Sequence, residues 1–269
     1  MGKFREVPTA LTIAGSDSGG GAGIQADLKT FAALGVHGTS AITCITAQNP
    51  RGVLGIQACS VSIVRSQLEA VFKELKPAAV KTGMLYSAPI IRTVAEYLRR
   101  QSAALVVDPV MISTSGAQLL KPAAVRSLCT ELLPLATLLT PNLNEAEMLL
   151  GERLTSVEDL RSAAKELHQR FGCAVLLKGG HLRGLKDAVD IFYDGKQEYL
   201  LSAPFVRGVS THGTGCTYSA AITGGLARGC SLPQAVQRAK EFITQAIAQS
   251  QTTARHFVLN SFWAGKVLK

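Results

Sequence analysis

Short apolar segments rich in β-branched residues alternate with longer amphipathic segments along most of this chain. Near-continuous apolar strands are buried on both faces, which is typical of a parallel sheet covered by helices. We expect strands at Ala10–Ala14, Ser40–Thr46, Ala78–Thr82, Ala104–Val107, Thr137–Thr140 and Ala174–Leu177. The alternation therefore favours an α/β fold.

The amphipathic segments predict helices that connect these strands. They lie at Ile24–Leu34, Val64–Leu75, Pro89–Arg100, Ala123–Leu132, Glu145–Leu150, Val157–Phe171, Thr217–Arg228 and Pro233–Ala248. Right-handed crossovers then build a three-layer α/β/α sandwich around a mostly parallel central sheet. Near the end, Val189–Tyr193 and Tyr199–Leu201 flank an Asp-Gly turn and predict a hairpin. Because no linker interrupts the pattern, we expect one domain over residues 1–269.

The chain has 269 residues, of which 47% are hydrophobic, so it can bury a substantial core and is not disordered. Its richest apolar stretch, Leu132–Leu139, is far shorter than the ~20 apolar residues of a membrane-spanning helix. The first residues, Met1–Pro8, show no apolar segment of a secretory signal. We therefore expect a cytoplasmic protein without membrane association.

The 28 lysines and arginines exceed the 19 acidic residues, which gives a net charge of +9. A positive surplus suits anionic ligands such as nucleotides. The basic residues are scattered, without a Lys/Arg block or interleaved aromatic residues, and this argues against nucleic-acid binding. The six cysteines form no C-x-x-C pair, so we expect reduced thiols rather than a zinc cage or disulfides.

Ligands of parallel α/β sheets bind at the carboxyl ends of the strands, and glycine-rich segments follow the strands here. The first, Gly15–Gly23, comes after the first expected strand and opens a helix. It lets the backbone approach a small ligand at Gly15, and it offers Asp17 to bind a polar group. The alternative is a flexible turn whose glycines only satisfy backbone geometry.

The same segment carries the pattern G-x-G-x-x-A at residues 21–26, a loose form of the dinucleotide-binding fingerprint. That fingerprint needs an acidic residue about 20 positions later to bind the ribose. Residues 28–68 contain no Asp or Glu. An NADP site that uses Arg51 stays open, but a dehydrogenase is the weakest of the interpretations.

A second glycine-rich segment, Thr211–Cys216, leads into another expected helix. Backbone N–H groups of Gly213, Thr214 and Gly215 at that helix start form an anion hole suited to a transferring phosphoryl group. No G-x-x-x-x-G-K-[ST] sequence occurs, which excludes a P-loop enzyme. Cys216 lies in the first helical turn, where the pKa of a thiol falls below its usual ~8.5. A packing role is the alternative for this cysteine.

Polar residues follow three further strands. Asn142 and Glu145 share a face at a helix start, where they form a capping box or hold a hydrated Mg²⁺, and spacing alone leaves both open. Asp108 lies at the end of one strand, where it is either a turn residue or a second carboxylate near the metal. Lys178 lies at the end of another strand, where its side chain either reaches phosphate oxygens or points into water. Together with the anion hole and the thiol, these groups describe phosphoryl transfer better than hydride transfer.

Seven motifs, in order along the chain, resemble those of the ribokinase superfamily, and more narrowly the hydroxymethylpyrimidine/phosphomethylpyrimidine kinases of thiamine biosynthesis. The motifs are Leu11–Asp27, Thr46–Asn49, Lys81–Met84, Asp108–Met111, Thr140–Asn142, Lys178–His181 and Thr211–Thr217. The resemblance implies a ribokinase-like fold and ATP-dependent phosphorylation of the hydroxymethyl group of 4-amino-5-hydroxymethyl-2-methylpyrimidine. It also implies a second transfer that converts the monophosphate to the diphosphate.

The same resemblance assigns roles by matched position. It implies that Gln48 binds the aminopyrimidine edge, as carboxamides bind adenine, and that Met84 and Val110 pack near the ring. It implies that Cys216 stands where relatives place the catalytic base. It further implies a homodimer, because relatives are commonly dimers. Residues expected at the ATP phosphates and Mg²⁺ are Lys178, Asn142, Thr211, Glu145 and Asp108.

Two features depart from the relatives. Many of them carry a lysine where this chain has Thr114, and many end in a glycine-rich segment where this chain has Gln251–Trp263. The alternatives are a pyridoxal/pyridoxine kinase, which also phosphorylates a hydroxymethyl group on a flat heterocycle, and a catalytically silent module that binds a pyrimidine or nucleotide. Gln48 favours the aminopyrimidine over a phenolic pyridine.

Overall fold

The structure, a computed structural model, describes residues 6–112, 120–180, 182, 184–209 and 212–263. Within this part of the chain, nine strands form one sheet in the order β3-β2-β1-β4-β5-β6-β7-β8-β9. The strands are β1 Thr9–Asp17, β2 His37–Asn49, β3 Gly52–Ala58, β4 Ala79–Thr82, β5 Ala104–Val107, β6 Leu138–Leu139, β7 Ala174–Lys178, β8 Asp187–Tyr193 and β9 Glu198–Pro204. A separate short hairpin pairs β10 Gln251–Thr253 with β11 His256–Val258.

Six neighbouring strands of the sheet, β2, β1, β4, β5, β6 and β7, are parallel to one another. At their two sides, β3 pairs antiparallel with β2, and β8 pairs antiparallel with β7. Antiparallel pairing of β8 with β9 confirms the expected late hairpin. The apolar segments form the buried centre of the sheet, because strands covered on both faces are apolar throughout. The expected mostly parallel α/β sheet is confirmed.

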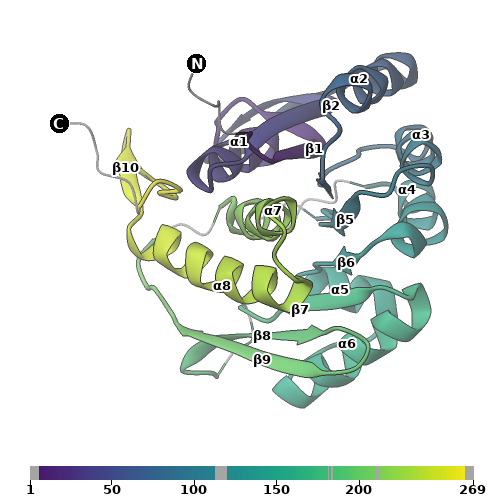
Figure 1. Ribbon diagram of the computed structural model, residues 1–269. Coiled ribbons are helices and arrows are strands. Elements are labelled where there is room, and N and C mark those ends of the chain that lie inside the picture. The colour runs from purple at the N-terminus through teal and green to yellow at the C-terminus, as the bar shows by residue number, and fades with distance from the viewer. Residues whose placement is uncertain (1–5, 113–119, 181, 183, 210–211, 264–269) are drawn as a thin grey trace.

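Helices cover both faces of the sheet (Figure 1). One face carries α1 Gly23–Ala33, α7 Thr214–Ala227 and α8 Leu232–Ala248. The other carries α2 Val61–Glu74, α3 Ala88–Leu98, α4 Pro122–Ser127, α5 Leu143–Leu150 and α6 Val157–Phe171. Because α7 lies between the sheet, α1 and α8, most of its residues are buried. None of the described helices is long and apolar enough to cross a membrane.

Two local features differ from the sequence-based expectation. The segment that forms β3 contains two glycines and mostly exposed side chains, which hide its strand pattern; it forms because it pairs with the end of β2. The helix expected at Ala123–Leu132 is helical to its end but changes type, since α4 ends at Ser127. A π turn at Leu128–Leu132 and a 3-10 turn at Leu133–Leu135 follow. Pro134 lacks the N–H group that a continuing helix needs.

The parallel strands bring their carboxyl ends to one edge of the sheet. β1 ends at Asp17, β7 ends at Lys178, and Asp108 directly follows β5. The first turn of α7 begins at Thr214, beside the same edge. Residues far apart in the sequence therefore meet at the place where ligands of such sheets bind.

Candidate active site

A cleft of about 370 Å³ opens at the carboxyl edge of the sheet. All of the site residues expected from the sequence that the structure describes line this cleft. They are Gly15, Asp17, Gln48, Met84, Asp108, Val110, Asn142, Glu145, Lys178, Gly213, Thr214, Gly215 and Cys216. Thr211 and Thr114 lie outside the described residues.

The carboxylate of Asp17 organises the first glycine-rich loop. Its Oδ1 accepts a hydrogen bond from the N–H of Gly19 at 2.8 Å, and its Oδ2 accepts from Gly21 and Ala22 at 3.1 and 2.8 Å. Nε2 of His212 lies 3.5 Å from Oδ2. Burial alone would raise the pKa of Asp17, but the hydrogen bonds from His212, Ala22 and Gly19 outweigh it and lower that pKa. Binding of substrate by Asp17 stays a prediction.

The two glycine-rich loops touch each other at Gly213. This residue has φ +81°, and a Cβ placed on it would lie 1.8 Å from the carbonyl oxygen of Gly21. Only glycine allows so close an approach. The contact fixes the start of α7 against the first loop. The partial positive charge of the helix N-terminus therefore faces the same cleft as that loop.

Lys178 and Asp108 form an ion pair beside the start of α7. Nζ of Lys178 donates to Oδ1 of Asp108 at 3.1 Å, and Oγ of Ser219 donates to Oδ2 at 3.1 Å. A Cβ at Gly215 would lie 3.4 Å from the same Nζ, so the ammonium lies beside the first turn of α7. Burial alone would lower the pKa of Lys178, but Asp108 and Glu145 raise it. The lysine is therefore charged at neutral pH.

Glu145 forms the capping box of α5. Its Oε2 accepts from the N–H of Asn142 at 2.9 Å, while Oδ1 of Asn142 accepts from the N–H of Glu145 at 2.9 Å. Its Oε1 accepts from the N–H of Met111 at 3.3 Å, next to Val110, whose backbone has φ +27°. Burial raises the pKa of Glu145 to about 7, with Lys178 opposing the shift. A metal-binding role for this residue stays a prediction.

The thiol of Cys216 differs from its expected state. Burial raises its pKa to about 11, and although Lys81 lowers that pKa, the carboxylates of Asp27 and Asp108 add to the increase. The backbone N–H of Gly23 also acts to lower that pKa. The expectation of a pKa below 8.5 is therefore wrong, because burial outweighs the helix N-terminus. Cys216 is protonated at neutral pH.

Gln48 lies at an irregular point in the pairing of β2 with β3. Its backbone N–H donates to Oγ of Ser18 at 2.8 Å, and that hydroxyl donates to the carbonyl of Gln48 at 2.7 Å. Oγ1 of Thr46 lies 3.1 Å from Oε1 of Gln48. These contacts hold the backbone in place, so the carboxamide lines the cleft from a fixed position.

The sequence reasoning missed two buried lysine–carboxylate pairs, of which Lys81, Lys240 and Asp190 line the cleft. Lys81 pairs with Asp27, and Lys240 pairs with Asp190 at 2.7 Å. Asp190 also accepts from the N–H of Gly179 at 3.0 Å, directly after Lys178. A lysine inside the otherwise uncharged strand β4 is the one signal that could have pointed to the first pair.

The comparisons with known proteins agree with this geometry. The profile of the family described as phosphomethylpyrimidine kinase matches residues 17–259. The chain belongs to the phosphomethylpyrimidine kinase family. This is a family of phosphotransferases, and its members use ATP as a kinase does.

Three relatives show how far the similarity extends. A hydroxymethylpyrimidine/phosphomethylpyrimidine kinase of Streptomyces coelicolor is 52% identical and covers 89% of this chain and 88% of its own. A crystal structure of phosphomethylpyrimidine kinase from Clostridium difficile 630 is 45% identical, with a TM-score of 0.80, and covers 90% of this chain and 99% of its own. An ADP complex of Bacillus subtilis pyridoxal kinase is 38% identical, with a TM-score of 0.88, over 96% and 99% of the two chains. The fold is that of the ribokinase-like kinases.

Proposed function

We propose that this enzyme transfers the γ-phosphoryl group of ATP to the hydroxymethyl group of 4-amino-5-hydroxymethyl-2-methylpyrimidine, and a second phosphoryl group to the resulting monophosphate, for thiamine biosynthesis. The observation that supports this best is the single cleft shared by the start of α7, Lys178 and Gln48. Backbone N–H groups and a charged lysine suit a phosphoryl group, and a carboxamide suits an aminopyrimidine.

The pyrimidine binds at the end of the cleft formed by the first two loops. Gln48 donates to a ring nitrogen and accepts from the exocyclic amine, as carboxamides do with adenine. Met84 and Val110 pack on the ring, and Gly15 leaves room for the side chain of Met84, since a Cβ there would lie 3.0 Å from its Cε. The positive φ of Val110 is a strained conformation of the kind found at ligand sites.

ATP binds at the other end, where apolar side chains of α8 and the segment after β9 line the cleft. Ile243 and Ile247 of α8 and Val206 offer a surface for the adenine ring. Lys178, Asn142 and Thr211 then bind the phosphates, and the N–H groups of the first turn of α7 receive the transferring group.

Magnesium would be held by Glu145 and Asp108. Among the described residues, no group of three or more His, Cys, Asp and Glu side chains is placed to form a metal cage. Two carboxylates fit a hydrated Mg²⁺ that also binds nucleotide phosphates, because this ion keeps several waters and takes one or two carboxylates. When bound there, it neutralises charge on the phosphates.

Transfer forms a bond between the substrate hydroxyl oxygen and the γ-phosphorus. The bond from that phosphorus to the β–γ bridging oxygen breaks, and ADP leaves with the electron pair. In a loose transition state the hydroxyl proton leaves late, so positioning contributes most of the rate. Cys216, after its thiol has released a proton to solvent, accepts the hydroxyl proton.

The direct test is ADP release from purified protein with ATP, Mg²⁺ and one alcohol at a time. We expect turnover with the aminopyrimidine and its monophosphate at least about tenfold above that with pyridoxal or pyridoxine, because Gln48 suits the aminopyrimidine edge. Faster turnover of pyridoxal than of the aminopyrimidine would instead indicate a pyridoxal/pyridoxine kinase. No ADP release with any alcohol would indicate a silent binding module.

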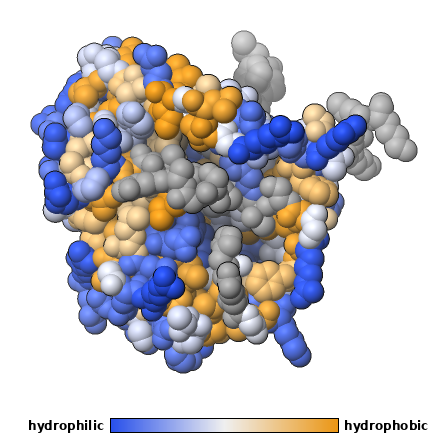
Figure 2. Space-filling view, turned by 180° about the vertical axis from the view of Figure 1, so that it is seen from behind, coloured by the Kyte–Doolittle hydropathy of each residue, from blue (hydrophilic) through white to orange (hydrophobic). Residues whose placement is uncertain are grey.

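A homodimer formed through the β2–β3 edge of the sheet is part of this proposal. Ile45 on β2 is 56% exposed, Leu54 on β3 is 80% exposed, and Val61 and Ile63 of α2 are also exposed. Figure 2 shows apolar surface at the top of the molecule, the end at which Figure 1 places β2 and α2. Exposed apolar side chains beside an edge strand mark an interaction surface.

Sedimentation equilibrium tests the homodimer. We expect twice the chain mass of 28.4 kDa for the wild type and a shift toward one chain mass for Leu54→Asp. A wild type that sediments at one chain mass contradicts the proposal. We also propose that residues 1–269 form a single domain located in the cytoplasm, where ATP is present and six free cysteines stay reduced.

A further inference from the structure

A β-bulge interrupts the pairing of β1 with β2 beside the end of the cleft proposed for the pyrimidine, and none of the steps above uses it. The parallel register of the two strands shifts by one residue between Ala14 and Ser16. Thr43 and Cys44 of β2 therefore both lie opposite Gly15 of β1. Bulges are rare between parallel strands, and beside an active site they often redirect a side chain.

The hydroxyl of Thr43, in this bulge, contacts the segment that follows β4. Oγ1 of Thr43 donates to the carbonyl oxygen of Met84 at 2.7 Å, and Thr43 is fully buried. In the sheet, β1 lies between β2 and β4. Because the backbone hydrogen bonds of a sheet join only neighbouring strands, they do not connect β2 with β4. The Thr43 hydroxyl therefore supplies a link, across the end of β1, that strand pairing does not provide.

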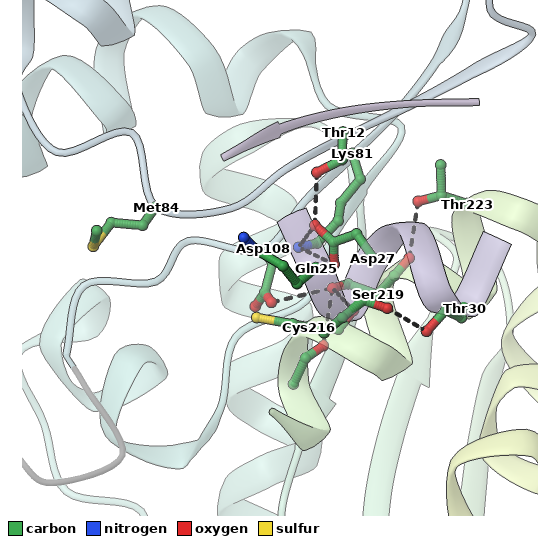
Figure 3. A network of polar contacts seen from close by, with 12 residues as sticks. Thr12, Gln25, Asp27, Thr30, Lys81, Met84, Asp108, Cys216, Ser219 and Thr223 are labelled. Atoms are coloured by element: carbon green, nitrogen blue, oxygen red, sulfur yellow. Dashed lines mark hydrogen bonds and ion pairs between the residues drawn. The ribbon is translucent and has the colours of Figure 1, made fainter. Parts of the chain in front are cut away.

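The side chain of Met84 is restrained at its far end as well. A Cβ placed on Gly15 would lie 3.0 Å from Cε of Met84 and 2.8 Å from Sγ of Cys44, so both side chains lie against the bare backbone of Gly15. Cys44 is fully buried and has no room to move away. Met84 lines the cleft, and its side chain points away from Lys81 and Cys216 (Figure 3). It thus forms a wall that is separate from the phosphoryl site.

The chain turns sharply just after Met84. The N–H of Ser87 donates to the carbonyl oxygen of Leu85 at 2.8 Å, and Tyr86 between them has φ +66°. A three-residue turn with a positive φ is rare and strained, and it persists only where the surrounding structure holds it. Leu85 is buried, which anchors the turn, and the Thr43 hydroxyl fixes the residue before it. The segment that carries Met84 is therefore held in one conformation.

We propose that Thr43 is a positioning residue for the pyrimidine: its hydroxyl holds Met84 in place as a fixed wall of the ring site. This rests on the proposed function, in which Met84 packs on the ring. A flat ring gains most from a wall that is already in place, because no loop or side chain has to be ordered when the ring binds. Without the hydroxyl, the segment after β4 is free to move, and binding must order it first.

Thr43→Val tests the hydroxyl, because valine has nearly the same shape and cannot donate a hydrogen bond. Calorimetry gives the Kd of 4-amino-5-hydroxymethyl-2-methylpyrimidine, and steady-state kinetics give its KM. We expect both constants to rise at least about fivefold, as the loss of one buried hydrogen bond does. The kcat and the KM for ATP should change little, because the variant leaves the phosphoryl site unaltered. Thermal unfolding checks that the variant folds.

Two further variants keep the test valid if Thr43→Val does not fold. Thr43→Ser keeps the hydroxyl and should bind the pyrimidine with a Kd near that of the wild type. Thr43→Cys is close to serine in size but has only a weak S–H donor, so its Kd should rise. The matched control is Thr39→Val on the same strand, where the lost hydroxyl donates to the carbonyl oxygen of Ala10 at 2.9 Å, away from the cleft. It should leave the Kd unchanged.

A double-mutant cycle tests whether Thr43 acts through Met84. If it does, Thr43→Val raises the Kd much less in the background of Met84→Ala than it does alone. Fully additive effects would overturn the proposal, and so would equal Kd values for Thr43→Ser and Thr43→Cys or a wild-type Kd in a folded Thr43→Val. A wild type that neither binds nor phosphorylates the pyrimidine contradicts the proposed function itself, and with it the ring site, before any variant is compared.

Discussion

At the scale of single residues, Cys216 makes the sharpest prediction. Cys216→Ala should lower kcat by about 10²-fold or more, because it removes the proton acceptor, and should leave ATP affinity nearly unchanged. Steady-state kinetics and nucleotide titration measure the two effects. Cys230→Ala is the matched control, since Cys230 lies at the far end of α7 near the small pocket formed with α8. Comparable turnover in the Cys216 variant would assign the thiol to packing.

Gln48 makes a second prediction at this scale. Gln48→Leu should abolish turnover of the aminopyrimidine, because the leucine neither donates to the ring nitrogen nor accepts from the amine. The backbone contacts with Ser18 remain, so the loop should keep its conformation. The measurement is kcat/KM for the pyrimidine, and a value equal to that of the wild type would refute the assignment.

Motif spacing predicted the residues of the cleft well, but not their ionisation. Residues at strand ends share one edge in any parallel sheet, so Gln48, Asp108 and Lys178 could be grouped from sequence alone. The high pKa of Cys216 depends instead on how deeply it is buried and on charges from other elements. The partner of Lys81 lies 54 positions away in the sequence, and no local pattern connects the two.

At the scale of elements, the contact between the two glycine-rich loops fixes the start of α7. A methyl group added at this contact should therefore have a large effect on activity. Gly213→Ala places a Cβ 1.8 Å from the carbonyl oxygen of Gly21, so the loops must separate. Gly229→Ala is the matched control, because its φ of +82° is nearly the same as +81° at Gly213 and no atom lies within 4 Å of the added Cβ.

Both substitutions place alanine in a left-handed conformation, which costs about 1–2 kcal/mol. Only Gly213→Ala should also disrupt the anion hole, so we expect kcat to fall at least about 10²-fold there and to stay near wild type in Gly229→Ala. Thermal unfolding and steady-state kinetics separate the two effects. Equal activity in both variants would show that the loop contact does not support catalysis.

Periodicity predicted the central elements because burial on both faces leaves a clear apolar signal. The edges of the sheet lack this signal. β3 is half-exposed and glycine-containing, and it becomes a strand only through its pairing with β2. The change from α-helix to π-helix after Ser127 is likewise a feature that the amphipathic pattern does not show.

At the scale of the whole molecule, the free energy of unfolding should depend on pH because a carboxyl group is buried at the cleft. Folding raises the pKa of Glu145 from its ordinary 4.5 to about 7. Between these values the folded chain binds a proton that the unfolded chain has lost. The contribution of Glu145 to stability is therefore fully present below pH 4.5 and is lost as the pH rises to about 7.

Glu145→Gln isolates this contribution, because a glutamine at the same position of a capping box can still accept the hydrogen bond from Asn142. Relative to the variant, the wild type should lose up to about 3 kcal/mol between pH 4.5 and pH 8. Urea unfolding of both proteins at several pH values measures the difference, and a flat or opposite trend would contradict it. The variant is therefore more stable than the wild type at pH 8, and if Glu145 binds Mg²⁺ it is also less active. The cleft then keeps a carboxylate that weakens the fold because phosphoryl transfer needs its charge.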